Sequence, residues 1–78
     1  MHLTPTEWGL LRVFVANAGR TLTHSYLFAQ VWGRSYGDAQ QYLRVHVASL
    51  RRKLERDPVR PERIKTEPGV GYRFETGA

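Results

Sequence analysis

The sequence predicts a mainly α-helical domain in which three helices are followed by a C-terminal β-hairpin. Apolar residues recur at helical spacing in three segments, 5–18, 24–32 and 39–56, and most of their ends carry capping or breaking residues. Two short stretches rich in β-forming residues then flank a Pro-Gly pair near the C-terminus. Because the chain has only 78 residues, we expect one small domain over 1–78.

The first helix is predicted over residues 5–18. Thr4 can cap it, Pro5 suits the first helical position, and Glu7 can complete a capping box with Thr4. Gly19 can adopt the left-handed conformation that ends a helix. The apolar residues at helical spacing are Trp8, Leu11, Phe14, Val15 and Ala18.

Residues 21–23 read as a short extended link, with Thr23 able to cap the second helix. That helix stops at Gly33, and residues 33–37 form a loop between two glycines. Its apolar residues fall in pairs four apart, Leu27 with Val31 and Phe28 with Trp32.

The third helix is the longest, at roughly 39–56, and Asp38 with Gln41 offers a capping pair at its start. Its core stripe is predicted to be Leu43, Val47, Leu50 and Leu54. Pro58 ends this region, and strands at 63–67 and 70–74 follow. They are joined at Pro68-Gly69, a pair that suits the centre of a type II turn.

Charge and composition narrow the possible functions. The net charge of +5 favours an anionic partner, and an apolar content of 41% argues against a disordered basic tail. The absence of cysteine excludes disulfides, thiol nucleophiles and cysteine-bound zinc, and indicates a cytoplasmic protein. His2, His24 and His46 lie in separate segments, and no phosphate-binding glycine loop is present, so we expect no enzyme, no metal site and no cofactor.

The positive charge is concentrated on the third helix, where no acid lies between Asp38 and Glu55. Opposite the core stripe, the helix presents small or hydrogen-bonding side chains bordered by cations. Such a face suits a DNA major groove, although a basic helix face can also be merely solvated. The candidates for base contacts are Gln41, Val45, Ser49 and Arg52, and those for phosphate contacts are Arg44, His46, Arg51 and Lys53.

Several segments together resemble the winged-helix effector domain of OmpR/PhoB-type response regulators. They are 3–7, 31–33, 42–55, 57–61 and 66–74, which together cover nearly the whole chain. The resemblance implies that Trp32 and the wing residues Thr66 and Arg73 also contact phosphates. It implies that Arg34 and Tyr36, in the loop after the second helix, contact RNA polymerase.

The resemblance also implies a two-component transcription regulator with a receiver domain that is absent here. That receiver would be phosphorylated through a sensor histidine kinase and would dimerise to place two effector domains on direct-repeat DNA sites. Segments 41–45 and 57–61 look most like members that control potassium-uptake genes.

Three departures from the family pattern are visible. The family's N-terminal sheet is reduced to a remnant near residues 2–4, which would leave a face of the first helix exposed. Ser49 and Pro68 stand where better-known members often have DNA-reading arginines. The alternative hypothesis is a protein-interaction winged helix that docks an acidic partner or RNA polymerase.

Overall fold

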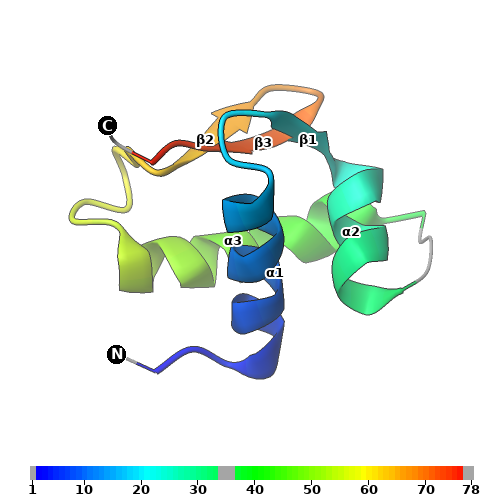
Figure 1. The fold of residues 1–78 in the computed structure, drawn as a ribbon, viewed down its shortest axis with the longest axis horizontal. Helices are drawn as coiled ribbons and strands as arrows, with labels where there is room; N and C mark the ends of the chain where they lie inside the picture. Colours follow the sequence, from blue (N-terminus) through cyan, green and yellow to red (C-terminus); the bar gives the residue numbers. More distant parts are fainter. Residues whose placement is uncertain (1, 34–36, 77–78) are drawn as a thin grey trace.

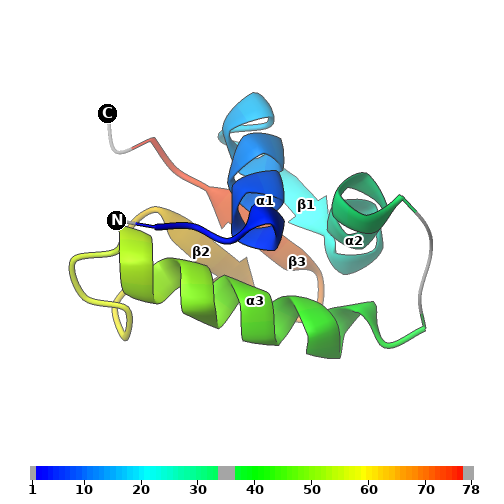
Figure 2. The same ribbon diagram turned by 90° about the horizontal axis from the view of Figure 1, so that it is seen from below.

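The computed structural model describes residues 2–33 and 37–76. The elements run in the order α1 (Pro5–Ala16), β1 (Thr21–Thr23), α2 (His24–Trp32), α3 (Ala39–Leu54), β2 (Ile64–Glu67) and β3 (Gly71–Phe74). The sheet lies across one end of α1, and α3 crosses behind α1 (Figure 1). Figure 2 shows α3 along one edge of the molecule, with α1, α2 and the strands all on its other side. This arrangement confirms the three helices and the wing.

Helix α1 begins as predicted, because the capping box between Thr4 and Glu7 is formed. The Glu7 amide donates to Thr4 Oγ1 at 3.2 Å, and the Thr4 amide donates to Glu7 Oε1 at 2.8 Å. The helix ends at Ala16, two residues before the predicted end. The reason is Asn17, whose side-chain amide donates to the carbonyl of Val13 at 2.9 Å and closes the last turn.

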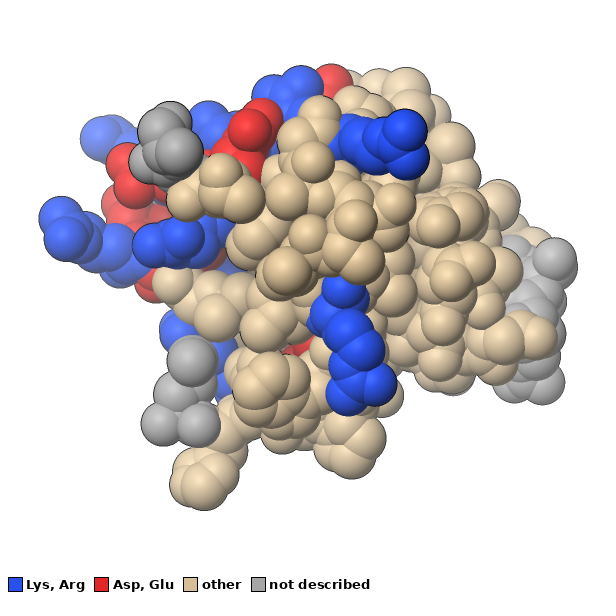
Figure 3. Space-filling model, viewed as in Figure 1, with Lys and Arg blue, Asp and Glu red and all other residues tan. Residues whose placement is uncertain are grey.

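One face of α1 packs into the core and the other is exposed. Leu10 and Phe14 are fully buried, whereas Trp8 and Val15 are 51% and 57% exposed. A hollow on this outer face is lined by Trp8, Leu11, Arg12, Val15 and Ala16. The face that carries α1 is largely uncharged, and charged side chains gather mainly at the end where α3 leads toward β2 (Figure 3). The expected exposure of a face of α1 is therefore confirmed, while residues 2–4 form no strand.

Residues 21–23 are extended as predicted, but they are more than a link, because they form strand β1. It pairs antiparallel with β3, with Leu22 opposite Tyr72, and gives a three-stranded sheet in the order β1-β3-β2. Burial of the Leu22 side chain brings its backbone against β3, where the ladder supplies hydrogen-bond partners. Gly71 permits this approach, since a Cβ there would lie 1.8 Å from the Leu22 carbonyl oxygen.

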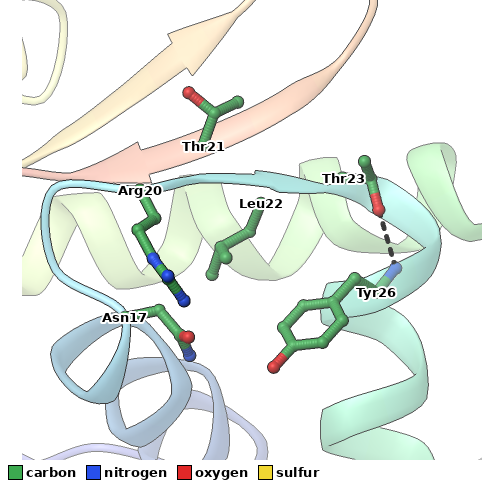
Figure 4. Close-up of a pocket in the computed structure, with 6 residues that line it drawn as sticks. All are labelled: Asn17, Arg20, Thr21, Leu22, Thr23 and Tyr26. Carbon is green, nitrogen blue, oxygen red and sulfur yellow. Dashed lines mark hydrogen bonds between the residues drawn. The ribbon is translucent and has the colours of Figure 1, made fainter.

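Helix α2 has the predicted ends. Thr23 Oγ1 accepts a hydrogen bond from the Tyr26 amide at 3.1 Å, beside a hollow into which Arg20 and Asn17 point (Figure 4). Gly33 ends the helix with a φ of 74°. The local capping signals at both ends are confirmed.

Helix α3 begins at residue 39 as predicted, but the predicted capping bond is absent and the helix ends two residues early. Asp38 occupies the N-cap position but makes no side-chain capping bond, because its φ of −101° and ψ of 33° lie outside the extended region that capping requires. The helix stops at Leu54 rather than 56, since Glu55 is extended and its carboxylate accepts bonds from the amides of residues 62–64. The stripe of Leu43, Val47 and Leu50 is fully buried as predicted, and Leu54 is partly buried.

The turn between β2 and β3 forms at the predicted place. Gly69 has a φ of 74°, and the Val70 amide donates to the Glu67 carbonyl at 3.0 Å. The core joins all elements through Leu10, Phe14, Leu22, Leu27, Phe28, Ala39, Leu43, Val47, Leu50, Ile64, Tyr72 and Phe74. Among the described residues, no helix is both long and apolar enough to cross a bilayer.

Candidate nucleic-acid interface

The outer face of α3 is an exposed, mixed surface. Gln41, Arg44 and Arg52 are exposed, and Val45 keeps 66% of its surface open to solvent. The opposite side of the helix is anchored by the fully buried Leu43 and other core residues. A rigid helix therefore presents one apolar, one amide and two cationic side chains outward, which suits contact with base edges and phosphates.

An aromatic cluster borders this face where α2 meets α3. Trp32 stacks on Phe28 with ring centroids 4.5 Å apart, and Tyr42 stacks on His46 at 6.0 Å. Trp32 and His46 lie 5.4 Å apart between centroids. The fold thus brings together two predicted phosphate contacts from different helices. A hollow beside them is lined by Gln41, Tyr42, Val45 and His46.

Two other predicted contact residues point toward α1 instead. Lys53 Nζ donates to Glu7 Oε1 at 2.6 Å, and the Ser49 hydroxyl donates to Glu7 Oε2 at 2.5 Å. Burial raises the pKa of Glu7, but the bonds from Lys53, Ser49 and the Thr4 amide, together with the Lys53 charge, outweigh it and hold the pKa at about 2. Glu7 is only 2% exposed, so an ionised carboxylate inside the domain holds both side chains.

The predicted contacts at the wing also have partners within the chain. Arg51 extends from α3 to β2, where it donates to the Ile64 carbonyl and to the Thr66 hydroxyl. Burial lowers the pKa of Arg51, and the charges of Tyr72 and Glu55 oppose that shift. Arg73 is paired with Glu67 at 3.1 Å and with Glu75 at 2.6 Å. Thr66 itself remains exposed.

Sequence reasoning missed the tertiary roles of Glu7 and Glu55. The sequence indicates Glu7 only as part of a capping box, and Glu55 only as the acid that ends the basic stretch. Both are buried, and both receive several hydrogen bonds, Glu7 from the distant α3 and Glu55 from the amides of residues 62–64. A signal is present for Glu7, which is the only acid in residues 1–37 and lies next to apolar residues of α1.

Some predictions lie beyond this geometry. Arg34 and Tyr36, the predicted polymerase contacts, fall outside the described residues. Within the described ranges, no group of three or more histidine, aspartate or glutamate side chains is placed to hold a metal ion.

Comparison with known proteins places this geometry in a family. Residues 1–74 match the model for "Transcriptional regulatory protein, C terminal". The transcriptional regulatory protein KdpE of Mycobacterium tuberculosis H37Rv is 51% identical over 75 residues, covering 96% of this chain and 33% of the relative. The chain therefore spans about a third of the length of this curated relative.

Solved structures agree with the fold. The Klebsiella pneumoniae RstA DNA-binding domain, solved in complex with the RstA box, has a TM-score of 0.86 at 27% identity, covering 95% of this chain and 73% of the other. The Thermotoga maritima response regulator DrrB, an OmpR/PhoB homologue, has a TM-score of 0.83 at 32% identity, covering 95% of this chain and 33% of the other. These matches confirm a transcriptional regulatory domain rather than an enzyme, and this chain belongs to the OmpR/PhoB-type family of winged-helix C-terminal domains of transcriptional regulatory proteins.

Proposed function

We propose that this domain binds double-stranded DNA in a sequence-specific way, with α3 in the major groove and the wing on the adjacent groove or backbone. The observation that carries the proposal is the outer face of α3, where Val45 and Gln41 stand exposed between cations on a helix fixed by a buried stripe. A hydrophobic side chain in that position has no role in a merely solvated face. The similarity to the RstA DNA-binding domain, which was solved in complex with the RstA box, supports DNA binding by this fold.

The contacts divide by chemistry. Val45 would meet a thymine methyl, while Gln41 and Arg52 would hydrogen-bond base edges. Arg44 and His46 would bind phosphates, joined by Trp32 at the aromatic border and by Thr66 and Arg73 from the wing. Ser49 and Lys53 would have to leave the buried Glu7 carboxylate to reach DNA, so we assign them to holding α3 on α1.

We further infer that the domain is the output part of a KdpE-like two-component regulator that controls potassium-uptake genes. The 51% identity to KdpE supports this assignment. In that setting a receiver domain, phosphorylated through a sensor histidine kinase, would pair two such domains on direct repeats. The segment 33–37, with Arg34 and Tyr36, would contact RNA polymerase.

Selection of bound sequences from random duplex DNA tests the proposal and identifies the target together. Mobility-shift titrations across salt concentrations then separate the roles. Arg44→Ala should flatten the salt slope by about one unit, whereas Arg52→Ala should reduce discrimination between sequences. Arg12→Ala, which removes an exposed cation from α1 away from the outer face of α3, is the matched control and should leave both unchanged.

Two results would refute specific DNA binding. Selection that enriches no sequence would contradict base readout. Equal affinity for duplex DNA and for heparin would favour the alternative, a winged helix that docks an acidic partner. A selected sequence that occurs upstream of potassium-uptake genes would support the KdpE-like role.

A further inference from the structure

Arg51 contacts both strands of the wing from its position on α3. Its Nε and Nη2 donate to the Ile64 carbonyl at 3.1 and 2.8 Å, and Nη2 also donates to Thr66 Oγ1 at 2.7 Å. Its guanidinium carbon lies 5.6 Å from the centre of the Tyr72 ring. Since Ile64 and Thr66 belong to β2 and Tyr72 to β3, the Arg51 side chain connects α3 to both strands of the hairpin.

At the base of the wing, the amide and the carbonyl of Ile64 both point away from β3, and side chains bind both of them. Strand β2 is an edge of the sheet, so backbone groups that face away from β3 need partners elsewhere. The Ile64 amide donates to Glu55 Oε2 at 2.8 Å, and its carbonyl accepts from Arg51. Arg51 lies in the last turn of α3 and Glu55 is the residue that caps its end, so the C-terminal end of α3 fixes the position and the direction of the wing.

The Thr66 hydroxyl is oriented by the same arginine. A threonine hydroxyl has one proton to donate and two lone pairs that accept. Because a lone pair of Thr66 accepts from Arg51, its proton is left to donate away from the guanidinium. Thr66 is exposed on the wing, where such a donor can meet an anionic oxygen.

We propose that Arg51 is a positioning residue: it sets the wing on α3 and turns the Thr66 hydroxyl toward a DNA phosphate, and does not itself bind phosphate. The proposal rests on the DNA binding proposed above and sharpens it. A cation that the sequence assigns to the DNA backbone instead acts through a second residue. The effect of Arg51 on DNA affinity should then depend on Thr66. Replacing Arg51 should not change the number of counterions released on binding.

Arg51→Lys is the discriminating variant because it keeps the charge and loses the planar fork that bonds a carbonyl through two nitrogens. A lysine would serve a direct phosphate contact nearly as well. We expect instead about fivefold weaker binding to the selected duplex, the worth of one lost hydrogen bond, with an unchanged salt slope. In the Thr66→Val background, which already lacks the hydroxyl, Arg51→Lys should cause no further loss.

The matched control is Arg44→Ala against Arg51→Ala, the same change on the same helix. Arg44→Ala should reduce the salt slope by about one unit, whereas Arg51→Ala should weaken binding and leave the slope alone. Circular dichroism melts set a titration temperature at which every variant is folded. Should Arg51→Ala not fold, Arg51→Lys with and without Thr66→Val decides the question alone.

Three results would overturn the proposal. If the salt slope of DNA binding falls in Arg51→Ala as it does in Arg44→Ala, then Arg51 is a phosphate contact. Additive losses from Arg51→Lys and Thr66→Val would separate the two residues. A lowered melting temperature with wild-type affinity would leave Arg51 a purely structural role. Failure of the proposed function would look different, since wild-type protein would then bind the selected and a scrambled duplex equally.

Discussion

Replacing Glu7 by glutamine should destabilise the domain by about 3 kcal/mol near neutral pH. The magnitude follows from the pKa of Glu7, which the fold lowers from 4.5 to about 2. Each pKa unit corresponds to about 1.4 kcal/mol of preference for the ionised form in the folded state. Glutamine resembles the protonated acid, so it forfeits this preference while keeping the size and the capping geometry of the side chain.

The sign of the pH dependence follows from the same shift. A carboxylate with a lowered folded pKa contributes its full stability above the unfolded pKa and loses it as the pH falls toward the folded pKa. Wild-type stability should therefore fall from about pH 5 to about pH 2 more steeply than that of Glu7→Gln, and the two should converge at the acid end.

Urea unfolding followed by circular dichroism at several pH values measures both effects. Glu62→Gln makes the same chemical change at an exposed acid and should alter stability by less than about 0.5 kcal/mol. If Glu7→Gln were as stable as wild type near neutral pH, or kept the full acid sensitivity, the buried carboxylate would not be the ionised link between α1 and α3 that its contacts indicate.

Three further predictions concern packing and readout. Gly71→Ala should cost about 3 kcal/mol or more in urea unfolding, because its Cβ would collide with β1, whereas Gly37→Ala, with open space around it, should change stability by under about 1 kcal/mol. Val45→Ala should leave the melting temperature unchanged and abolish a preference of about fourfold for thymine over uracil in the selected duplex, measured by mobility shift. Lys53→Met should lower stability by about 1 to 3 kcal/mol, because it leaves Glu7 with fewer partners, and should not change the salt slope of DNA binding.

The parts of the fold that the sequence predicts are those set by neighbouring residues. The Thr4 capping box, the Thr23 cap, the left-handed Gly33 and the turn at Gly69 each depend on a few consecutive residues, and all four are present. A helical stripe such as that around Leu43 is likewise a local pattern, and its burial is confirmed. The order of three helices and a C-terminal hairpin follows from the same local patterns, and the family resemblance identifies that hairpin as a wing.

The strand at 21–23 is not predicted because it depends on pairing between distant parts of the chain. Residues 21–23 are too few to be recognised as a strand from their sequence. They form one because they pair with β3, which lies some fifty residues later and has a glycine, Gly71, at the point of closest approach. Asp38 carries a good capping side chain, but the backbone that enters α3 holds it in the wrong conformation. Neither the pairing of β1 nor the backbone conformation of Asp38 follows from the local rules for caps and turns.

The same reasoning applies to the positive charge of α3. The segment reads as a row of cations without local acids, and a count of them would give the number of phosphates it neutralises. In the folded domain Lys53 is paired with Glu7 from α1, and Arg51 is bonded to the wing backbone. Arg44 and Arg52 remain exposed beside Val45. Part of the charge of this helix therefore holds the domain together, and we propose that the exposed part, Arg44 and Arg52, contacts DNA.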